Sequence, residues 1–283
     1  MRFEKWQALG NDYIVVERDR LPFELTPARI RALCAPHLGV GSDGVLVLGA
    51  PSDPRFVAAL RIFNPDGSEA ELSGNGAREA VVYLRSAGWT DASTFSIQTA
   101  AGEVRPTIHD DGMCTLDMGR ARLRSDAYPD GAQDGVGELE AGGRRWRFRH
   151  VSVGNPQCAI ALHELIDLER LEVATVGRAI ERHALFPQRT NVSFSVALAP
   201  GTLRTRIFER GVGETLASGT GATGAAVAHV LGGGQSPVRV QLDGGELTVA
   251  VGEDLHVDLT GPATPVFAGE LAGPFLEELH ATE

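Results

Sequence analysis

Two segments of the chain repeat one pattern at a fixed spacing. Residues 63–82 read FNPDGSEAELSGNGAREAVV, and residues 208–227 read FERGVGETLASGTGATGAAV. A weaker match at nearly the same spacing pairs Gly10-Asn11 with Gly154-Asn155. Self-similarity of this kind is typical of a duplicated structural unit. The chain of 283 residues is therefore predicted to fold as two similar half-domains that meet near residue 120.

Turn residues, among them 34 glycines, interrupt the chain about every ten residues and predict many short strands. Few helices compete with these strands. Thr26-Pro27 is a typical helix start and predicts a helix to about Leu33, and a second helix is predicted over Val173–His183. Two more helices are predicted to begin just after Gly76 and just after Gly221.

The expected fold class is α+β, with mostly antiparallel sheet. The N-terminal half-domain is predicted over residues 1–119 and the C-terminal half-domain over residues 120–263. The tail, residues 264–283, is expected to pack back on the first half. Residues 124–143 are rich in Gly and Asp and are expected to form an exposed connection or a loose hairpin.

Composition excludes several classes of protein. The net charge of −11 argues against nucleic-acid binding, because the densest basic cluster, in the run RRWRFR at residues 144–149, alternates with aromatic residues as one face of a strand would. Lys5 is the only lysine and lies in a strand-like run, which argues against a pyridoxal-phosphate enzyme. No apolar run approaches the roughly 18 residues of a membrane helix, and the start of the chain has no signal-peptide pattern, so the cytoplasm is the expected location.

The three cysteines, Cys34, Cys114 and Cys158, are odd in number and widely spaced. They form neither a disulfide framework nor a metal-binding pattern. We expect no metal and no organic cofactor.

Each copy of the repeat reads as strand, polar loop, Ser-Gly-x-Gly-Ala and apolar helix. Unpaired amides at a helix N-terminus, with the positive end of the helix dipole behind them, bind carboxylates or phosphates. Two such termini predict a site for one small anionic ligand between the halves. The alternative is that each serine is an ordinary helix cap. The run Gly219-x-Gly221-x-x-Gly224 also fits a dinucleotide fingerprint with Asp243, but no strand directly precedes it and the other copy has Glu79 in place of the third glycine.

At these residues the sequence resembles the diaminopimelate epimerases, which are cofactor-independent amino-acid epimerases. The resemblance covers nearly the whole chain, through the motifs ALGNDYIVV, GVGSDGVLVL, FNPDGSEAELSGNGAR, VSVGNPQ, RTNVSF and ERGVGETLASGTGA. It implies two pseudo-symmetric halves, each a barrel-like sheet around a central helix, with the active site in the cleft between them. It also implies a homodimer, and a reaction in the synthesis of lysine and peptidoglycan precursors.

The resemblance implies that two cysteine thiols exchange the Cα proton of the substrate from opposite faces. In this sequence the two positions are Ser73 and Ser218, and a serine hydroxyl is a poor base unless a neighbour activates it. The family motif GNPH is GNPQ here, which replaces a histidine near the first thiol with Gln157. Glu209 or Glu214 is a candidate base for the serines.

The binding residues implied by the resemblance are retained. Four are expected to hold the distal amino-acid end of the substrate, namely Asn64, Asn155, Asn191 and Arg210. Seven are expected to hold the reacting centre, namely Asn11, Gly74, Asn75, Gly76, Glu209, Gly219 and Thr220. An arginine suits the distal end because a guanidinium grips a carboxylate with two parallel hydrogen bonds.

Three interpretations remain open. The first is a diaminopimelate epimerase, or a close amino-acid epimerase, with serine in place of both thiols and impaired or altered activity. The second is a divergent member that isomerises or dehydrates another amino acid, with Glu209 or Glu214 as the base. The third is a non-catalytic protein that binds an amino acid. In the first two, Ser73 Oγ and Ser218 Oγ are expected to face each other across the substrate Cα.

Overall fold

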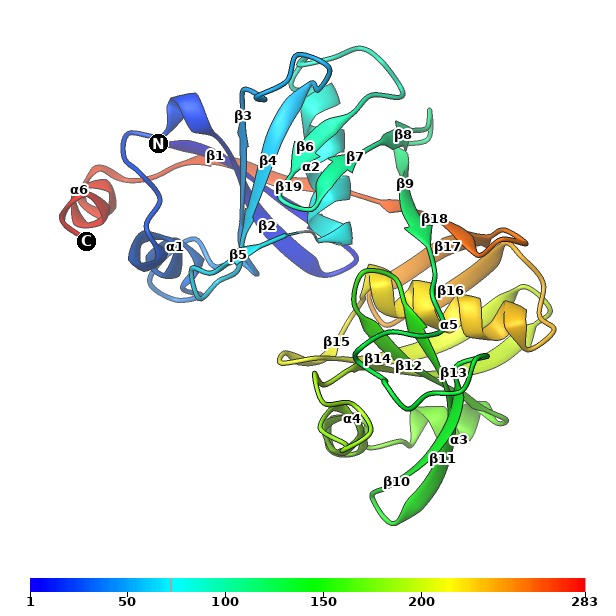
Figure 1. Ribbon diagram of the computed structural model, residues 1–283. Helices are drawn as coiled ribbons and strands as arrows, with labels where there is room; N and C mark the ends of the chain where they lie inside the picture. The colour runs from blue at the N-terminus through cyan, green and yellow to red at the C-terminus, as the bar shows by residue number, and fades with distance from the viewer. Residues whose placement is uncertain (72, 283) are drawn as a thin grey trace. The chain divides into compact units, whose positions relative to one another are not determined.

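A computed structural model describes residues 1–71 and 73–282 of the chain. The chain divides into two compact units (Figure 1). The first contains Met1–Leu116 together with the C-terminal segment from Gly261, and the second contains Asp117–Thr260.

The first unit contains four helices and nine strands in its described residues. The helices are η1 (Arg18–Arg20), α1 (Pro27–Cys34), α2 (Gly74–Ser86) and α6 (Gly273–Ala281). The strands are β1 (Arg2–Ala8), β2 (Asn11–Glu17), β3 (Val45–Gly49), β4 (Ala58–Phe63), β5 (Glu69–Ala70), β6 (Ile97–Thr99), β7 (Gly102–Val104), β8 (Pro106–Ile108) and β19 (Thr264–Glu270). Strand β9 (Met113–Arg120) crosses from the first unit into the second.

The second unit is built from a similar set of elements. Its helices are α3 (Leu165–Glu169), α4 (Val173–Glu181) and α5 (Gly219–Leu231). Its further strands are β10 (Val136–Ala141), β11 (Arg144–Ser152), β12 (Pro156–Leu162), β13 (Asn191–Ala199), β14 (Thr202–Glu209), β15 (Gly213–Thr215), β16 (Val238–Leu242), β17 (Gly245–Val251) and β18 (His256–Pro262).

The first sheet and the matching part of the second share one strand order, which confirms the predicted duplication, and the second sheet continues through β18, β9 and β8. Strand β2 runs parallel to β3 and β4 parallel to β6, and in the second unit β12 runs parallel to β13 and β14 parallel to β16. The hairpin of β4 with β5 has its counterpart in the hairpin of β14 with β15. Most of the remaining pairs are antiparallel, as predicted for this α+β fold.

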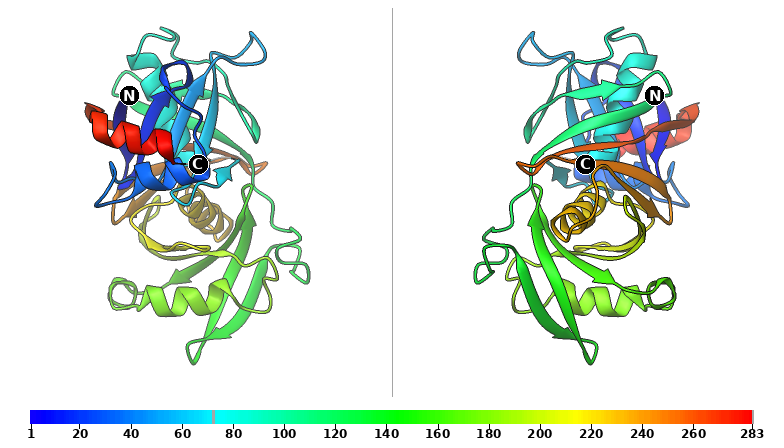
Figure 2. Two further views of the ribbon diagram at one scale, coloured as in Figure 1. Left: turned by 90° about the vertical axis from the view of Figure 1, so that its left-hand side faces the viewer. Right: turned by 90° about the vertical axis from the view of Figure 1, so that its right-hand side faces the viewer.

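Each sheet packs one face on a central helix and covers the other with peripheral helices. Helix α2 contacts β1, β2, β3 and β8, whereas α5 contacts β11, β12, β13, β14, β16 and β17. On the outer face of the first sheet α1 and α6 share a core through Leu33 and Leu279, and Figure 2 shows the two helices side by side. On the outer face of the second sheet, a core that contains Val173 and Ile180 of α4 also contains Leu168 of α3.

The structure corrects the predicted starts of the central helices and distinguishes the two alternatives for residues 124–143. The central helices begin at Gly74 and Gly219, two residues before Gly76 and Gly221, because the serine before each helix caps it and the glycines already lie in the first turn. Of the two alternatives for residues 124–143, an exposed connection or a loose hairpin, the structure favours a hairpin, because β10 pairs with β11 across a tight turn. The Arg-rich β11 is the predicted strand, with Trp146 and Phe148 buried.

No helix in the described part of the chain has the length and apolar character needed to span a membrane.

Small residues let helix α5 lie close to its sheet. An added Cβ at Gly224 would lie 2.7 Å from Cβ of Gln157 on β12, which is closer than real Cβ atoms approach. The fully buried helix positions Ala222 and Ala226 are also small. The third glycine of the dinucleotide-like run is therefore explained by packing, and Asp243 is held in an ion pair with Arg204.

Helix α2 buries two ionisable residues side by side, Arg78 and Glu79, both fully excluded from solvent. Arg78 hydrogen-bonds to Oδ1 of Asn75 at 2.7 Å and to the carbonyl oxygens of Gly74 and Pro262. Neither carboxyl oxygen of Glu79 has a hydrogen-bond partner among the described residues. Burial raises the pKa of Glu79 to about 9, against the attraction of Arg78, and burial lowers the pKa of Arg78 to about 10.

We expect Gly224→Ala to lower the free energy of unfolding by about 1–3 kcal/mol, because the new Cβ overpacks the contact between α5 and Gln157. Gly273→Ala is the matched control, since a Cβ there meets no atom within 4 Å. Urea denaturation of the two variants measures both effects. Equal stability of the two variants would contradict this account of the α5 packing.

Glu79→Gln is expected to stabilise the fold at pH 8 by about 2 kcal/mol or more, and to change it little at pH 4. The unfolded carboxyl ionises above its ordinary pKa of 4.5, while the folded one stays protonated up to about 9, so the natural protein loses stability as the pH rises between these values. Glutamine does not titrate and is spared that loss. Thermal unfolding midpoints measured from pH 4 to pH 8 test this, with Glu277→Gln, at an exposed position, as the control. Midpoints that change with pH in the same way for Glu79→Gln and the natural protein would contradict it.

Candidate active site

Ser218 caps helix α5 and contacts a carboxylate. Its Oγ accepts a hydrogen bond from the backbone amide of Gly221 at 3.3 Å and donates one to Oε2 of Glu209 at 2.9 Å. The serine is 3 % exposed. A hydroxyl oxygen accepts up to two hydrogen bonds, so Oγ keeps one lone pair for a further proton while its own proton points at the carboxylate. The hydroxyl proton of Ser218 is thus directed at the carboxylate of Glu209.

The hairpin of β14 and β15 positions Glu209 at the end of β14. Arg206 on β14 binds Glu214 on β15 through both Nε and NH2, at 2.9 and 2.6 Å. Glu214 is therefore engaged by an arginine, and of the two candidate bases only Glu209 hydrogen-bonds to the serine. The corresponding hairpin of the first unit has the same clamp, Arg61 with Glu69, at 2.9 and 2.8 Å.

A second contact joins the start of α5 to the turn before β12. Asn155 donates from Nδ2 to Oγ1 of Thr220 at 3.2 Å, and Gln157 donates from Nε2 to Oδ1 of Asn155 at 2.6 Å. Gly154 has a φ of 95°, a conformation that favours glycine and that places Asn155 beside the helix. Gln157 is buried, and its Oε1 has no hydrogen-bond partner among the described residues.

In the first unit, Ser73 caps α2 in the same way, and its Oγ accepts from the amide of Gly76 at 3.1 Å. The hydroxyl of Tyr13, on β2, donates a second hydrogen bond to this oxygen at 3.3 Å. Both lone pairs of Ser73 Oγ are thus engaged, which leaves its own proton for donation to another group. Tyr13 was missing from the predicted site residues, although its counterpart in the repeat is Gln157, two residues after the matched asparagine.

Asn75 in the first turn of α2 belongs to a network of polar side chains beside the start of the helix. It donates to Oδ1 of Asn11 at 3.1 Å, and Asn11 donates to Oδ2 of Asp43 at 2.9 Å. Lys5 forms an ion pair with Asp12, whose backbone amide also binds Asp43. Asn11 and Asn75 correspond to Asn155 and Thr220 of the second unit, so the duplication repeats this contact as well.

The residues expected at the distal end of a substrate lie at the ends of strands or on the turns beside them. Asn64 donates to Oγ of Ser68 within the β4–β5 hairpin at 2.9 Å. Asn191 is buried, accepts from the Arg210 amide at 2.8 Å and donates to the Pro156 carbonyl at 3.1 Å. Asn191 thereby fixes the turn from which the guanidinium of Arg210 extends.

Within each unit, the structure brings part of the predicted set to the N-terminus of the central helix. Asn11 contacts Asn75 at the start of α2, and Asn155 and Glu209 contact Thr220 and Ser218 at the start of α5. The amides of Gly74 and Asn75, and those of Gly219 and Thr220, come before the first intrahelical hydrogen bonds. Each helix terminus therefore offers amide donors and a partial positive charge to an anion. The prediction that the two serines face one substrate stays a prediction.

The three cysteines do not contribute thiolates. All three are free and buried. Burial raises the pKa of Cys34 and of Cys114 to about 12, and raises that of Cys158 well above its ordinary value. Cys158 lies in the outer core with Phe208 and Val192, on the opposite face of β12 from Gln157, which agrees with the alternation expected of a strand.

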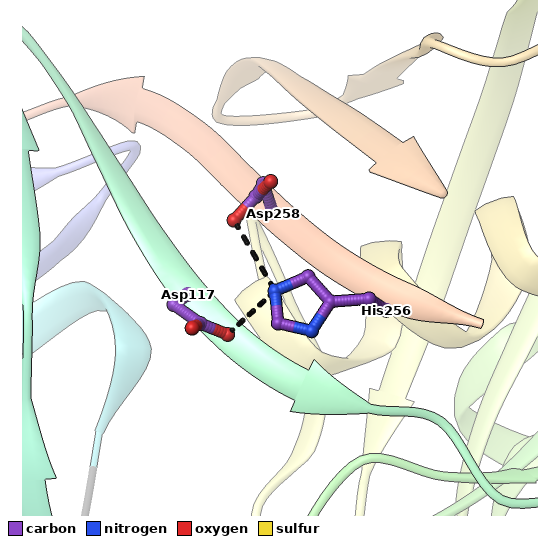
Figure 3. A group of neighbouring side chains, drawn as sticks. All are labelled: Asp117, His256 and Asp258. Atoms are coloured by element: carbon purple, nitrogen blue, oxygen red, sulfur yellow. Dashed lines mark ion pairs between the residues drawn. The ribbon is translucent and has the colours of Figure 1, made fainter. Parts of the chain in front are cut away.

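A separate group of ionisable residues lies on β9 and β18. Figure 3 shows Asp117, His256 and Asp258 converging from these strands. Nε2 of His256 lies 3.1 Å from Oδ1 of Asp117 and 3.9 Å from Oδ1 of Asp258. Asp117 is exposed and the other two are half-buried, so the geometry is that of a surface ion pair.

Comparison with known proteins gives matches over nearly the whole chain. The family model described as Diaminopimelate epimerase matches residues 3–124 and 149–266. A diaminopimelate epimerase of Synechococcus sp. (strain JA-3-3Ab) is 42% identical over 281 residues, which covers 96% of this chain and 98% of that protein. A diaminopimelate epimerase of Azoarcus sp. (strain BH72) is 41% identical over 279 residues, covering 97% and 99%.

Solved structures share the fold at low sequence identity. A probable proline racemase from Agrobacterium radiobacter K84 superposes with a TM-score of 0.69 at 16% identity, covering 96% of this chain and 93% of that one. A phenazine biosynthesis protein of the PhzF family from Bacillus anthracis gives a TM-score of 0.68 at 18% identity, covering 96% and 99%. The family-model match and the two relatives above 40% identity show that the chain belongs to the diaminopimelate epimerase family.

Proposed function

We propose that the protein interconverts LL- and meso-diaminopimelate by moving the proton at Cα, with Ser73 and Ser218 as the two groups that exchange it from opposite faces. The observation that supports this proposal most directly is the hydrogen bond from Ser218 Oγ to Glu209. A serine paired with a carboxylate has the activating neighbour that its weak acidity demands.

The proton transfer balances as follows. The Cα–H bond breaks and its proton passes to Ser218 Oγ, while the hydroxyl proton of Ser218 passes to Oε2 of Glu209. The electron pair of the broken bond moves into the α-carboxylate of the substrate. Ser73 then donates its hydroxyl proton to the other face of Cα, which inverts the configuration. The cycle closes when the proton held by Glu209 returns through water to the half-site of Ser73. The proposal uses no metal and no organic cofactor.

Charge that develops on the α-carboxylate needs donors in fixed positions. The first-turn amides of α2 (at Gly74, Asn75 and Gly76) and of α5 (at Gly219 and Thr220) supply them in this proposal. Asn11 and Asn155 support these turns through their contacts with Asn75 and Thr220. At the distal end, Arg210, Asn64, Asn155 and Asn191 bind the second amino-acid group.

Incubation with LL-diaminopimelate in heavy water tests the activity, with α-deuterium followed by NMR. The natural protein is compared with a variant that combines Ser73→Cys and Ser218→Cys. Exchange by the serine protein supports the proposal. Exchange by the cysteine variant alone shows that the scaffold is an epimerase whose chemistry requires thiols. Binding without exchange by either favours a binding protein, and absence of both binding and exchange overturns the substrate assignment.

Glu209→Gln is expected to lower the rate of α-deuterium incorporation by roughly 100-fold or more, because the amide keeps a hydrogen bond to Ser218 but does not take its proton. Glu214→Gln is the matched control, since Glu214 is engaged by Arg206 and its loss should change the rate by less than about threefold. Substrate affinity from calorimetry should stay the same in both variants. A larger loss of rate in Glu214→Gln than in Glu209→Gln would show that Glu209 is not the base.

We also propose that the protein works as a cytoplasmic homodimer, as its family resemblance implies. Edge strand β19 exposes apolar side chains, with Val266 56% and Phe267 47% exposed. An exposed apolar edge strand can pair with the same strand of a second copy of the chain. Light scattering should give about twice the 30.1 kDa chain mass, and Phe267→Glu should shift the protein toward the monomer. The control is Leu38→Glu, at an exposed position between α1 and β3; a monomeric natural protein would overturn the proposal.

A further inference from the structure

The duplicated half-sites differ at the group that contacts each serine. In the repeat, Asn64 stands where the second half has Glu209, and Tyr13 stands where the second half has Gln157. The surrounding framework is the same in both halves, because Asn11 contacts the start of α2 as Asn155 contacts the start of α5. The two half-sites therefore differ in the ionisable group that hydrogen-bonds to the serine, a phenol at Ser73 and a carboxylate at Ser218.

Neither Asn64 nor Gln157 can act as a base, since an amide side chain does not take up a proton near neutral pH. Asn64 also donates its Nδ2 hydrogen bond to Ser68 within its own hairpin. In the first unit, the ionisable side chain that hydrogen-bonds to Ser73 Oγ among the described contacts is Tyr13, at 3.3 Å. Tyr13 is 5% exposed, which holds the phenol in place.

We propose that Tyr13 is the proton partner of Ser73 and does in the first half-site what Glu209 does in the second. This inference rests on the proposed epimerase function. It also assigns a direction of proton transfer in the resting protein, from the substrate to Ser218 and from Ser73 to the substrate. Ser218 donates to Glu209 and has a lone pair left, so it is arranged to accept a proton. Ser73 accepts from Tyr13 and Gly76 and has its proton left, so it is arranged to donate one.

The transfer is balanced in protons. As Ser73 gives its hydroxyl proton to Cα, the O–H bond of Tyr13 breaks and its proton goes to Ser73 Oγ, which leaves a phenolate. A phenol, with an ordinary pKa of about 10, is far more acidic than an aliphatic alcohol, so this relay avoids a free alkoxide. One turnover converts Glu209 carboxylate and Tyr13 phenol into carboxylic acid and phenolate. A proton returned through water from Glu209 to Tyr13 restores the starting state, and the reverse reaction uses the same steps backwards.

Tyr13→Phe removes the hydroxyl and keeps the ring. We expect it to lower kcat by roughly 100-fold with KM changed by less than about twofold, and to alter the alkaline limb of the pH profile. In a Ser73→Cys background the same change should cost less than about threefold, because a thiol with an ordinary pKa of about 8.5 needs no phenol. Tyr83→Phe, which removes the other buried phenol of the first unit, is the control and should leave kcat unchanged. Equal losses from Tyr13→Phe in the serine and cysteine backgrounds would assign Tyr13 a structural role and overturn the proposal.

A second measurement does not depend on activity. The protein has three tyrosines, and burial raises the pKa of Tyr83 and of Tyr128. The difference in tyrosinate absorbance between the natural protein and Tyr13→Phe therefore isolates the ionisation of Tyr13. Ser73→Ala removes the oxygen that accepts the phenol hydrogen bond and should move this transition to lower pH by about half a unit or more. An unchanged transition overturns the pairing of Tyr13 with Ser73. Absence of isotope exchange in every variant, with the transition shifted, overturns the proposed epimerase function instead.

Discussion

The candidate site depends on one interaction that occurs twice, the hydrogen bond from a first-turn helix amide to a serine hydroxyl oxygen. Ser73 and Ser218 each accept such a bond, from Gly76 and Gly221. This bond fixes the rotamer of each serine and holds its oxygen beside unpaired amides at the positive end of a helix. Capping and catalysis are therefore compatible roles of the same atom, because a hydroxyl has one proton and two lone pairs and the cap uses only one lone pair.

The duplicated scaffold positions two serines alike, while the residues around them make the two chemically different. A carboxylate contacts Ser218, and a phenol contacts Ser73. An epimerase must accept a proton on one face and donate one on the other, so two identical half-sites would have to be in opposite protonation states at each turnover. Different partners give the two serines opposite hydrogen-bonding roles before the substrate arrives.

The sequence predicted the duplication, the α+β class and the abundance of short strands, because these follow from local turn chemistry and from a repeat that is visible without coordinates. It also located the two serines at helix starts. It missed strand β10, whose short edge segment Val136–Ala141 is stabilised mainly by pairing with β11. It missed Tyr13 as well, because a tyrosine in an apolar strand looks like a core residue until its hydroxyl is seen beside Ser73. The choice between Glu209 and Glu214 required the contact of Arg206, which lies outside the motif.

The ion pairs Arg61–Glu69 and Arg206–Glu214 stabilise the two hairpins, and they do so without the residue at the end of each leading strand. Both clamps grip the hairpin by its strands and leave the residue at the end of the leading strand, Asn64 in one copy and Glu209 in the other, outside the ion pair. That position is consequently free to diverge while the hairpin keeps its shape. A substitution at this position changes the group at the end of one hairpin and leaves the ion pairs of both hairpins in place.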